Sequence, residues 1–366
     1  MAGGVERVLT LKANYFAEHF GYDITIILTE GKGKPFFYPL SDKVKVINLD
    51  LGFEELWKCS FVKKILVYLK KQHRYKKLLS KELMHIRPDI TISLLRREIN
   101  FINEIKDGSK KVGELHVNRA NYRNFEANET NTLKNWFSKF WNRSLVSKLR
   151  KLDRFVVLTE EDKVSWTELD NVEVIPDPLA FEIGKISSLT NKRVIAVGRY
   201  VYQKGFDLLL HSWAMIEKQH PDWQLVVYGM GNREPYEHII DELQIDCSRC
   251  HLYGNTSDIK KEYLDSSIFV FSSRFEGFGM VLIEAMACGL PVVSFDCPCG
   301  PKDIINHNVD GLLVENGNVK ELALGLSELM NDEKELKRFS IEARKNVVRF
   351  SLESIADRWK SLFDNL

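Results

Sequence analysis

The chain has no apolar run that approaches the roughly 18 residues of a membrane-spanning helix. Its first residues also lack the basic and then apolar layout of a secretory signal peptide. The net charge is only +1, which argues against a nucleic-acid-binding protein. The D-x-D acid pair that often holds a divalent ion is absent as well. These absences predict a protein of the cytosol that binds no nucleic acid and needs no metal.

Six cysteines are scattered along the chain. Cys247 and Cys250 have the C-x-x-C spacing of half a zinc site, and Cys297 and Cys299 follow as a C-x-C pair. The second spacing is a poor zinc half-site, and strand-like segments surround both pairs. A zinc site is therefore only an alternative interpretation of these residues, beside the simpler one of buried or surface thiols.

At 366 residues the chain is too long for one ordinary core, so two domains are expected. Short β-branched runs alternate with longer amphipathic segments, a pattern typical of βαβ units. We therefore predict an α/β protein with two Rossmann-like domains facing across a cleft, joined near Pro176-Asp-Pro178. The expected strands fall at residues 23–29, 44–51, 89–95, 111–115, 154–159 and 172–175, and then at 193–197, 224–228, 251–253, 267–272, 291–295 and 311–314.

The start of the chain departs from the pattern of a doubly wound domain. In such a domain a central strand comes first and a glycine-rich turn follows it. Here Gly3 and Gly4 come almost at once, before a helical pattern and only then a strand. We therefore expect that the opening strand of the first domain is missing.

The strongest motif runs from Arg274 to Pro291, directly after an expected strand. Gly277 and Gly279 favour a permissive turn, and the residues from Met280 onward favour a helix that Gly289 ends. A glycine turn that opens a helix presents backbone N–H groups and the positive end of the helix dipole. This segment therefore predicts a phosphate site, with a diphosphate as the natural ligand.

Two acids, Glu276 and Glu284, belong to the same motif. A retaining glycosidase needs carboxylates about 5 Å apart, whereas eight helical residues would separate Cα atoms by about 12 Å. We therefore favour two hydroxyl-binding acids on one extended ligand over a catalytic pair. A solvated helix position is the alternative for Glu284, although its apolar neighbours make burial, and hence a polar partner, the better interpretation.

A second motif, Gly198-Arg199 with Lys204, opens the second half of the chain after its first expected strand. Two cations at the carboxyl end of that strand can neutralise a diphosphate leaving group. Since no acid pair for magnesium is found, these cations are expected to replace a metal.

With these motifs the sequence resembles the family-4 retaining glycosyltransferases, which have the GT-B fold. The resemblance spans essentially the whole chain and rests on Gly3-Gly4-Val-Glu-Arg7, the Arg199 and Lys204 pair, Glu276-x7-Glu284, Val174-Ile-Pro-Asp-Pro178, Cys297-Pro-Cys-Gly-Pro301 and the segment from Phe350 to Trp359. It implies domains at residues 1–178 and 179–350, and a terminal helix at 351–366 that returns to the first domain.

The resemblance also implies roles for single residues. Arg199 and Lys204 would hold the diphosphate, Glu276 the hydroxyls of the transferred sugar, and Glu284 the ribose. His116 would lie near the anomeric centre as a catalytic residue, the alternative being a loop histidine that caps local backbone. The rest of the donor site would be backbone from Gly3, Gly4, Gly198, Gly277, Phe278, Gly279, Met280 and Val281.

The activity so implied is sugar transfer from a nucleotide-diphosphate donor, with a UDP-sugar favoured. The expected acceptor is a glycan or lipid-linked molecule of envelope polysaccharide synthesis, which two basic, aromatic stretches of the first half suggest. No cofactor is expected. An epimerase or hydrolase acting on nucleotide sugars is one alternative, since fold does not fix function. A non-catalytic, membrane-docked partner of an assembly complex is another.

Two stretches without acids, residues 57–81 and 134–151, combine lysines and arginines with apolar and aromatic residues. Such basic helices suit an anionic membrane surface, and a peripheral place on the inner membrane face follows from that interpretation. The alternative is that their apolar residues pack a core and their cations only face solvent.

Overall fold

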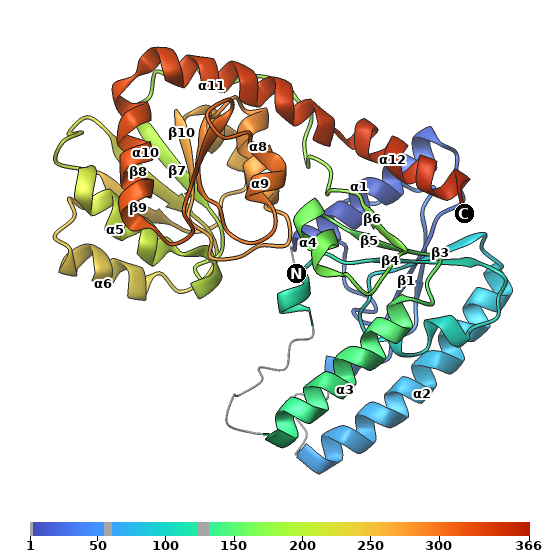
Figure 1. The fold of residues 1–366 in the computed structure, drawn as a ribbon. Coiled ribbons are helices and arrows are strands. Elements are labelled where there is room, and N and C mark those ends of the chain that lie inside the picture. The colour runs from blue at the N-terminus through green and yellow to red at the C-terminus, as the bar shows by residue number, and fades with distance from the viewer. Residues whose placement is uncertain (1–2, 55–60, 123–131) are drawn as a thin grey trace. The chain divides into compact units, whose positions relative to one another are not determined.

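The computed structural model describes residues 3–54, 61–122 and 132–366, the side chains of 61–63 and 132–140 excepted. The chain divides into two compact units (Figure 1). The first unit comprises residues 1–158, 162–175 and 356–366, and the second comprises 159–161 and 176–355. Each unit is an α/β structure whose strands all pair in parallel.

The second unit contains one parallel sheet with the strand order β12-β11-β10-β7-β8-β9. This is the order of a doubly wound nucleotide-binding sheet, in which the first strand lies beside the fourth. The strands are β7 (Arg193–Val197), β8 (Gln224–Tyr228), β9 (Cys250–Tyr253), β10 (Ile268–Phe271), β11 (Val292–Phe295) and β12 (Gly311–Val314).

Helices connect these strands and bury their apolar sides on the sheet. They are α5 (Phe206–Ile216), α6 (Glu234–Glu242), α7 (Ile259–Leu264), α8 (Met280–Ala287), α9 (Pro301–Ile304), α10 (Val319–Asn331) and α11 (Glu333–Asn346). Trp213 of α5 and Leu326 of α10 belong to one apolar cluster with Val194 and Val227 of the sheet. Because helices cover both faces of a parallel sheet, its strands are continuously apolar, as in Ile-Phe-Val-Phe of β10.

The first unit contains two parallel sheets, one of order β1-β2 and one of order β3-β4-β5-β6. The strands are β1 (Thr25–Leu28), β2 (Lys45–Asn48), β3 (Ile90–Ser93), β4 (Lys110–Glu114), β5 (Arg154–Val157) and β6 (Val172–Val174). All twelve expected strands are therefore found, with ends that differ by a few residues. The helices are α1 (Gly4–His19), α2 (Phe61–Ile86), α3 (Thr132–Leu149) and the short α4 (Glu160–Ser165).

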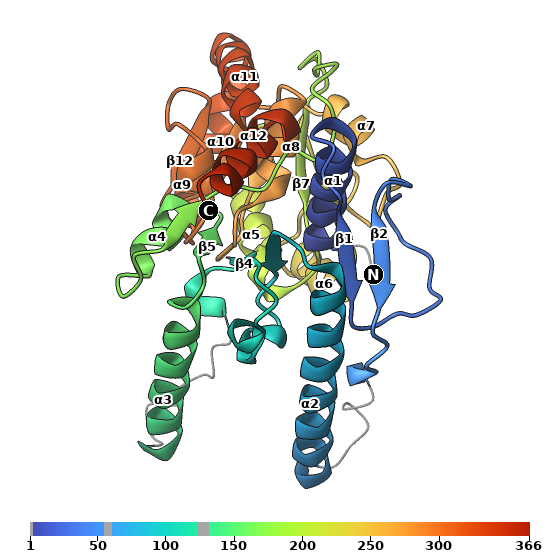
Figure 2. The same ribbon diagram turned by 90° about the vertical axis from the view of Figure 1, so that its right-hand side faces the viewer.

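Helices α2 and α3 both run out beyond the four-stranded sheet in the same direction (Figure 2). The 26 residues of α2 make it about 39 Å long. Tyr75, Leu79 and Leu83 of this helix are buried in the core, whereas Leu66 and Leu69 nearer its start are exposed. Among the helices of the described ranges, none combines the length and the apolarity needed to cross a bilayer.

The last helix, α12 (Leu352–Asp364), belongs to the first unit from Ala356 onward. Trp359 is 1% exposed there, and the Phe363 ring lies 5.8 Å from that of Phe16 in α1. The final helix thus packs on α1.

Candidate functional site

The second unit places two loops at a point where the strand order of its sheet reverses. Strand β7 pairs directly with β10, while β8 continues the sheet on the other side of β7. The carboxyl ends of parallel strands lie at one edge, and ligands of doubly wound sheets bind beside such a reversal. Loop 198–205, after β7, and loop 272–279, after β10, meet at this edge.

Two glycines shape loop 198–205 by close backbone contact. Gly205 has a φ of +61°, and a Cβ there would lie 2.0 Å from the Ser272 carbonyl oxygen. A Cβ on Gly229, after β8, would lie 1.6 Å from the Gly198 carbonyl oxygen. Gly205 and Gly229 therefore let neighbouring backbone segments approach this loop, and Gly205 is also the N-cap of helix α5.

Arg274 ties the second loop to the first. Its guanidinium donates two hydrogen bonds to the Asp207 carboxylate, at 2.8 and 2.6 Å, and lies 4.1 Å from the centre of the Tyr202 ring. Its backbone N–H also donates to the Gln203 carbonyl, and the Ser272 hydroxyl donates to the Lys204 carbonyl. This fork geometry holds Arg274 in one place, so it braces the loops instead of presenting a charge to a ligand.

Lys204 and Glu276 come together at the centre of these loops. The Lys204 ammonium lies 2.6 Å from the Glu276 carboxylate, and the side chains are 14% and 9% exposed. The Gln203 amide donates to the other carboxylate oxygen at 3.3 Å. Arg199 lies on the same loop and is exposed. An anion that binds at these loops would therefore contact the exposed Arg199 and also Lys204, whose charge the Glu276 carboxylate neutralises.

Helix α8 starts at Met280, four residues after Glu276, and offers backbone donors. Its N-cap, Gly279, has a φ of +98° and provides no side-chain cap. The first N–H groups of a helix have no acceptor within it, so those of Met280 and Val281 are suited to an anion. Gly277 and Phe278 precede them, and the Phe278 carbonyl packs so closely on Gly300 that a Cβ there would lie 1.9 Å away.

Glu284 lies one turn into α8 and is 5% exposed. The Tyr263 hydroxyl lies 3.4 Å from its carboxylate. Its burial excludes the alternative of a solvated helix position. A buried carboxylate that keeps polar partners can accept hydrogen bonds from ligand hydroxyls.

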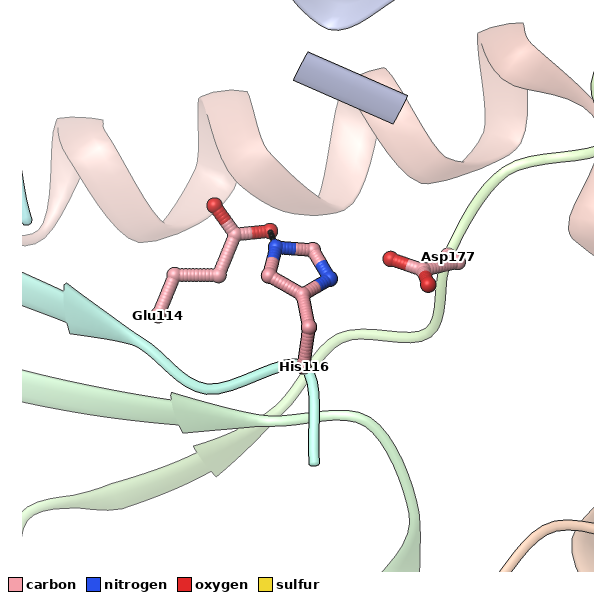
Figure 3. Close-up of side chains that lie close together, drawn as sticks. All are labelled: Glu114, His116 and Asp177. Carbon is pink, nitrogen blue, oxygen red and sulfur yellow. Dashed lines mark ion pairs between the residues drawn. The ribbon is translucent and has the colours of Figure 1, made fainter. Parts of the chain in front are cut away.

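The other expected site residues, Gly3, Gly4 and His116, belong to the first unit. Gly3 is the N-cap of α1, and Gly4 is its first residue. His116 follows β4, and its Nε2 lies 3.3 Å from Glu114 Oε1, which is shown as a dashed line in Figure 3. The Lys12 ammonium of α1 forms an ion pair with the same carboxylate oxygen.

The zinc interpretation of the cysteines is wrong. Cys250 is the first residue of the edge strand β9, whereas Cys297 lies beyond the carboxyl end of β11, on the other side of the sheet's centre. Three strands lie between β9 and β11, which corresponds to about 19 Å across the sheet. Burial also raises the pKa of the Cys250 thiol to about 12, which disfavours a zinc-binding thiolate. The two pairs therefore cannot bind one ion.

Sequence reasoning missed several polar partners at these positions. Gln203 and Tyr263 contact the two glutamates, but no spacing marks them. Tyr228 and Tyr253 end the neighbouring strands β8 and β9, and their rings stack 4.8 Å apart. The alternation of side chains along a strand predicts on which face of the sheet each tyrosine lies, but not which residue it contacts. Since Tyr253 is exposed at the same edge as the loops, its ring could stack on a planar base.

Residues 182–346 match the family of glycosyl transferases group 1. The chain is 29% identical to an uncharacterized glycosyltransferase of Haemophilus influenzae, with 99% of this chain and 96% of the relative covered. It is 28% identical to the poly(ribitol-phosphate) alpha-N-acetylglucosaminyltransferase of Staphylococcus aureus over 72% of this chain, and spans only 53% of that relative's length.

Among solved structures, Anabaena HepE in complex with UDP has a similar fold, with a TM-score of 0.72. The similarity covers 100% of this chain and 97% of HepE, at 17% sequence identity. This likeness confirms the expected α/β fold of the GT-B class. The similarity to glycosyl transferases group 1 lies within the second unit, whereas the similarity of fold extends over the whole chain.

Proposed function

We propose that this protein is a retaining, family-4 type glycosyltransferase that takes a sugar from a nucleotide-diphosphate donor without a metal ion. The observation that carries the proposal is the Lys204 and Glu276 pair beside the uncapped start of α8, at the reversal of strand order. Donors for a diphosphate and acceptors for sugar hydroxyls are thus close together in one unit.

In this mechanism Arg199, Lys204 and the first N–H groups of α8 stabilise the negative charge of the departing diphosphate. Glu276 accepts hydrogen bonds from hydroxyls of the transferred sugar, and Glu284 accepts them from the ribose. The bond between the anomeric carbon and the phosphate oxygen breaks as the acceptor oxygen bonds to that carbon from the same face. The acceptor proton passes to the departing phosphate oxygen, so configuration is retained without a covalent enzyme intermediate.

The comparisons support a choice of substrates. The fold neighbour HepE binds UDP, which favours a UDP-sugar donor. The Staphylococcus aureus relative is named for transfer to poly(ribitol-phosphate), which favours a glycan or lipid-linked acceptor of the cell envelope. In the first unit, His116 would act near the anomeric centre, and Gly3 and Gly4 would let backbone approach the donor.

A donor screen tests the proposal. The full chain is incubated with UDP-sugars, alone and with envelope-glycan acceptors, and products are measured by mass spectrometry. Transfer that depends on the acceptor is expected. Epimerised sugar from the donor alone, or hydrolysis that no acceptor suppresses, would instead indicate the epimerase or hydrolase. A chain that binds no donor in a titration would be the non-catalytic partner.

We also propose that the enzyme works as a peripheral protein on the inner membrane face, docked through α2. Lys70, Arg74 and Lys77 form an exposed stripe on this helix, next to the exposed Leu66 and Leu69. Cations beside apolar groups suit the anionic lipids of the cytoplasmic leaflet.

Not all of the expected surface can contribute to this docking. Lys71 donates to the backbone carbonyls of Leu51 and Gly52, and Lys76 forms an ion pair with Glu104. Residues 57–60 and the side chains of 61–63 and 134–140 lie outside the part of the chain that the structure describes.

A further inference from the structure

A buried cluster of two charged side chains, Glu114 and Lys12, lies beside His116 in the first unit. Glu114 is the last residue of β4 and its side chain is 2% exposed. Lys12 reaches it from α1 with a side chain that is 6% exposed, and its ammonium lies 4.5 Å from the centre of the Trp359 ring. The three parts of the chain that meet here are α1, β4 and α12.

The register of β4 explains why Glu114 and His116 lie together. The Leu115 N–H donates to the Val156 carbonyl, so the strand pairing continues past Glu114. Residues two apart in an extended strand point to the same side, which places Glu114 and His116 on one face. The side chain of His116 is 7% exposed, so its ring is held in a confined space.

Opposite charges face each other in this cluster. Burial alone would raise the pKa of the Glu114 carboxyl, but Lys12 and His116 together lower it to about 2. Glu114 is therefore an anion at neutral pH and accepts a hydrogen bond from His116. A buried carboxylate of this kind is stable only with its partners in place. Rotation of the His116 ring away from Glu114 would remove one of them and is therefore unfavourable.

We propose that Glu114 is a positioning residue for His116 and that Lys12 holds Glu114 in place for this task. The inference rests on the proposed function, in which His116 acts at the transferred sugar. Glu114 fixes Nε2 as the ring nitrogen that faces the domain interior and carries the proton. A carboxylate that orients a histidine in this way sets both its tautomer and its angle.

A double-mutant cycle tests the proposal on the full chain. Glu114→Gln keeps the shape of the side chain but removes its charge, and we expect kcat to fall by about 10-fold or more with the KM for the donor nearly unchanged. In a His116→Ala background the same substitution should change kcat by less than about 2-fold. A fall of equal size in both backgrounds would mean that Glu114 acts independently of His116, and would overturn the inference.

A second measurement is independent of turnover. In protein labelled with nitrogen-15 histidine, the ring signals of His116, assigned with His116→Ala, should report a proton on Nε2 in the wild type. In Glu114→Gln this preference should weaken. An unchanged tautomer would contradict the inference even if turnover falls.

The design separates misfolding and a wrong function from a wrong inference. Lys12→Met combined with Glu114→Gln removes both charges, so that neither is left buried alone, and should keep the fold with the same loss of kcat. Retained kcat in this folded variant would overturn the inference. If wild-type protein transfers no sugar, or if His116→Ala turns over normally, the proposed function fails, while the tautomer measurement still decides whether Glu114 positions the ring.

Discussion

Lys204 Nζ and Glu276 Oε1 lie 2.6 Å apart, and each side chain is the other's ion-pair partner. A donor that binds by the proposed mechanism must divide this pair, because Lys204 turns to phosphate while Glu276 turns to hydroxyls. The exchange replaces one set of charge-assisted contacts by two others. The ion pair therefore keeps both side chains largely buried and oriented until a ligand replaces each as the other's partner.

Removing Lys204 should reduce both stability and turnover. Lys204→Ala leaves the Glu276 carboxylate largely buried without its cation, and we expect a loss of about 2 kcal/mol in the free energy of unfolding. Turnover should fall by on the order of 100-fold, because a stabiliser of this kind contributes about 3 kcal/mol. Denaturant melts and donor kinetics measure the two effects.

Arg199→Ala is the matched comparison for Lys204→Ala. Because Arg199 is exposed, its loss should lower turnover to a similar extent while stability stays within about 0.5 kcal/mol of the wild type. Lys192→Ala removes an exposed ion pair with Asp222 and should change neither quantity. Normal kinetics of both site variants with a true donor would remove the phosphate-binding assignment.

Gly205→Ala should destabilise the second unit. The new Cβ would meet the Ser272 carbonyl oxygen, and the positive φ is unfavourable for alanine. We expect a loss of about 2 kcal/mol or more, measured by thermal unfolding. Gly254→Ala is the control, because no atom lies within 4 Å of a Cβ at that exposed position. Equal melting temperatures of the two variants would show that the loops do not depend on this contact.

The Glu114 carboxylate should make the first unit acid-sensitive. Its pKa in the folded protein is about 2 against an ordinary 4.5, so the unfolded chain binds the proton more readily. The carboxylate therefore stabilises the folded protein by on the order of 3 kcal/mol. This stabilisation is complete above pH 4.5 and is lost as pH falls toward 2. The stability difference between wild type and Glu114→Gln should therefore shrink across this range.

Glu168→Gln serves as the comparison for that acid titration. Hydrogen bonds from Arg119 also lower the pKa of Glu168 to about 2, but this carboxylate is 43% exposed. Solvent screening should make its effect on unfolding much smaller. A difference for Glu114→Gln that does not change with pH would contradict the assigned titration.

Vesicle binding should depend on the exposed stripe of α2. Changing Lys70, Arg74 and Lys77 to Glu should abolish binding to anionic vesicles, and wild-type binding should weaken as salt is raised, because each cation contributes about 1 kcal/mol. Co-sedimentation measures both effects. The same change at Lys218, Lys320 and Lys334, exposed positions of the second unit, should leave binding intact. Salt-insensitive or absent binding would favour an acceptor away from the membrane.

Metal chelation should leave turnover unchanged. The proposed mechanism assigns the charge of the departing diphosphate to Arg199, Lys204 and backbone donors. Donor kinetics with and without a chelator measure this directly. A loss of activity that magnesium restores would show that these groups do not carry the charge alone.

Much of the fold follows from the sequence because parallel strands are apolar without interruption. Strands β7, β8 and β12 begin and end at the residues expected for them. Others are shorter than expected, as in β3, because apolar residues extend beyond the hydrogen-bonded ladder. The two loops beside the reversal were identified because glycines and charges directly follow apolar strands.

What the sequence did not reveal depends on contacts between distant segments. Lys12 lies in an amphipathic helix, where a lysine ordinarily indicates the solvent face, yet it is buried against Glu114. The same problem affects Lys71, which the charge pattern assigns to a membrane surface although it donates to backbone carbonyls. A charge pattern specifies which residues are polar, whereas only the tertiary structure specifies their partners.

The brace formed by Arg274 has a consequence for ligand capture. Since its guanidinium binds Asp207 while its backbone binds Gln203, the turns on either side of the strand reversal form one preorganised body. A nucleotide that reaches this body has little chain left to immobilise, so more of its contact energy is expressed as affinity. Specificity for the base and sugar can then change through a few side chains, on a scaffold that itself stays constant.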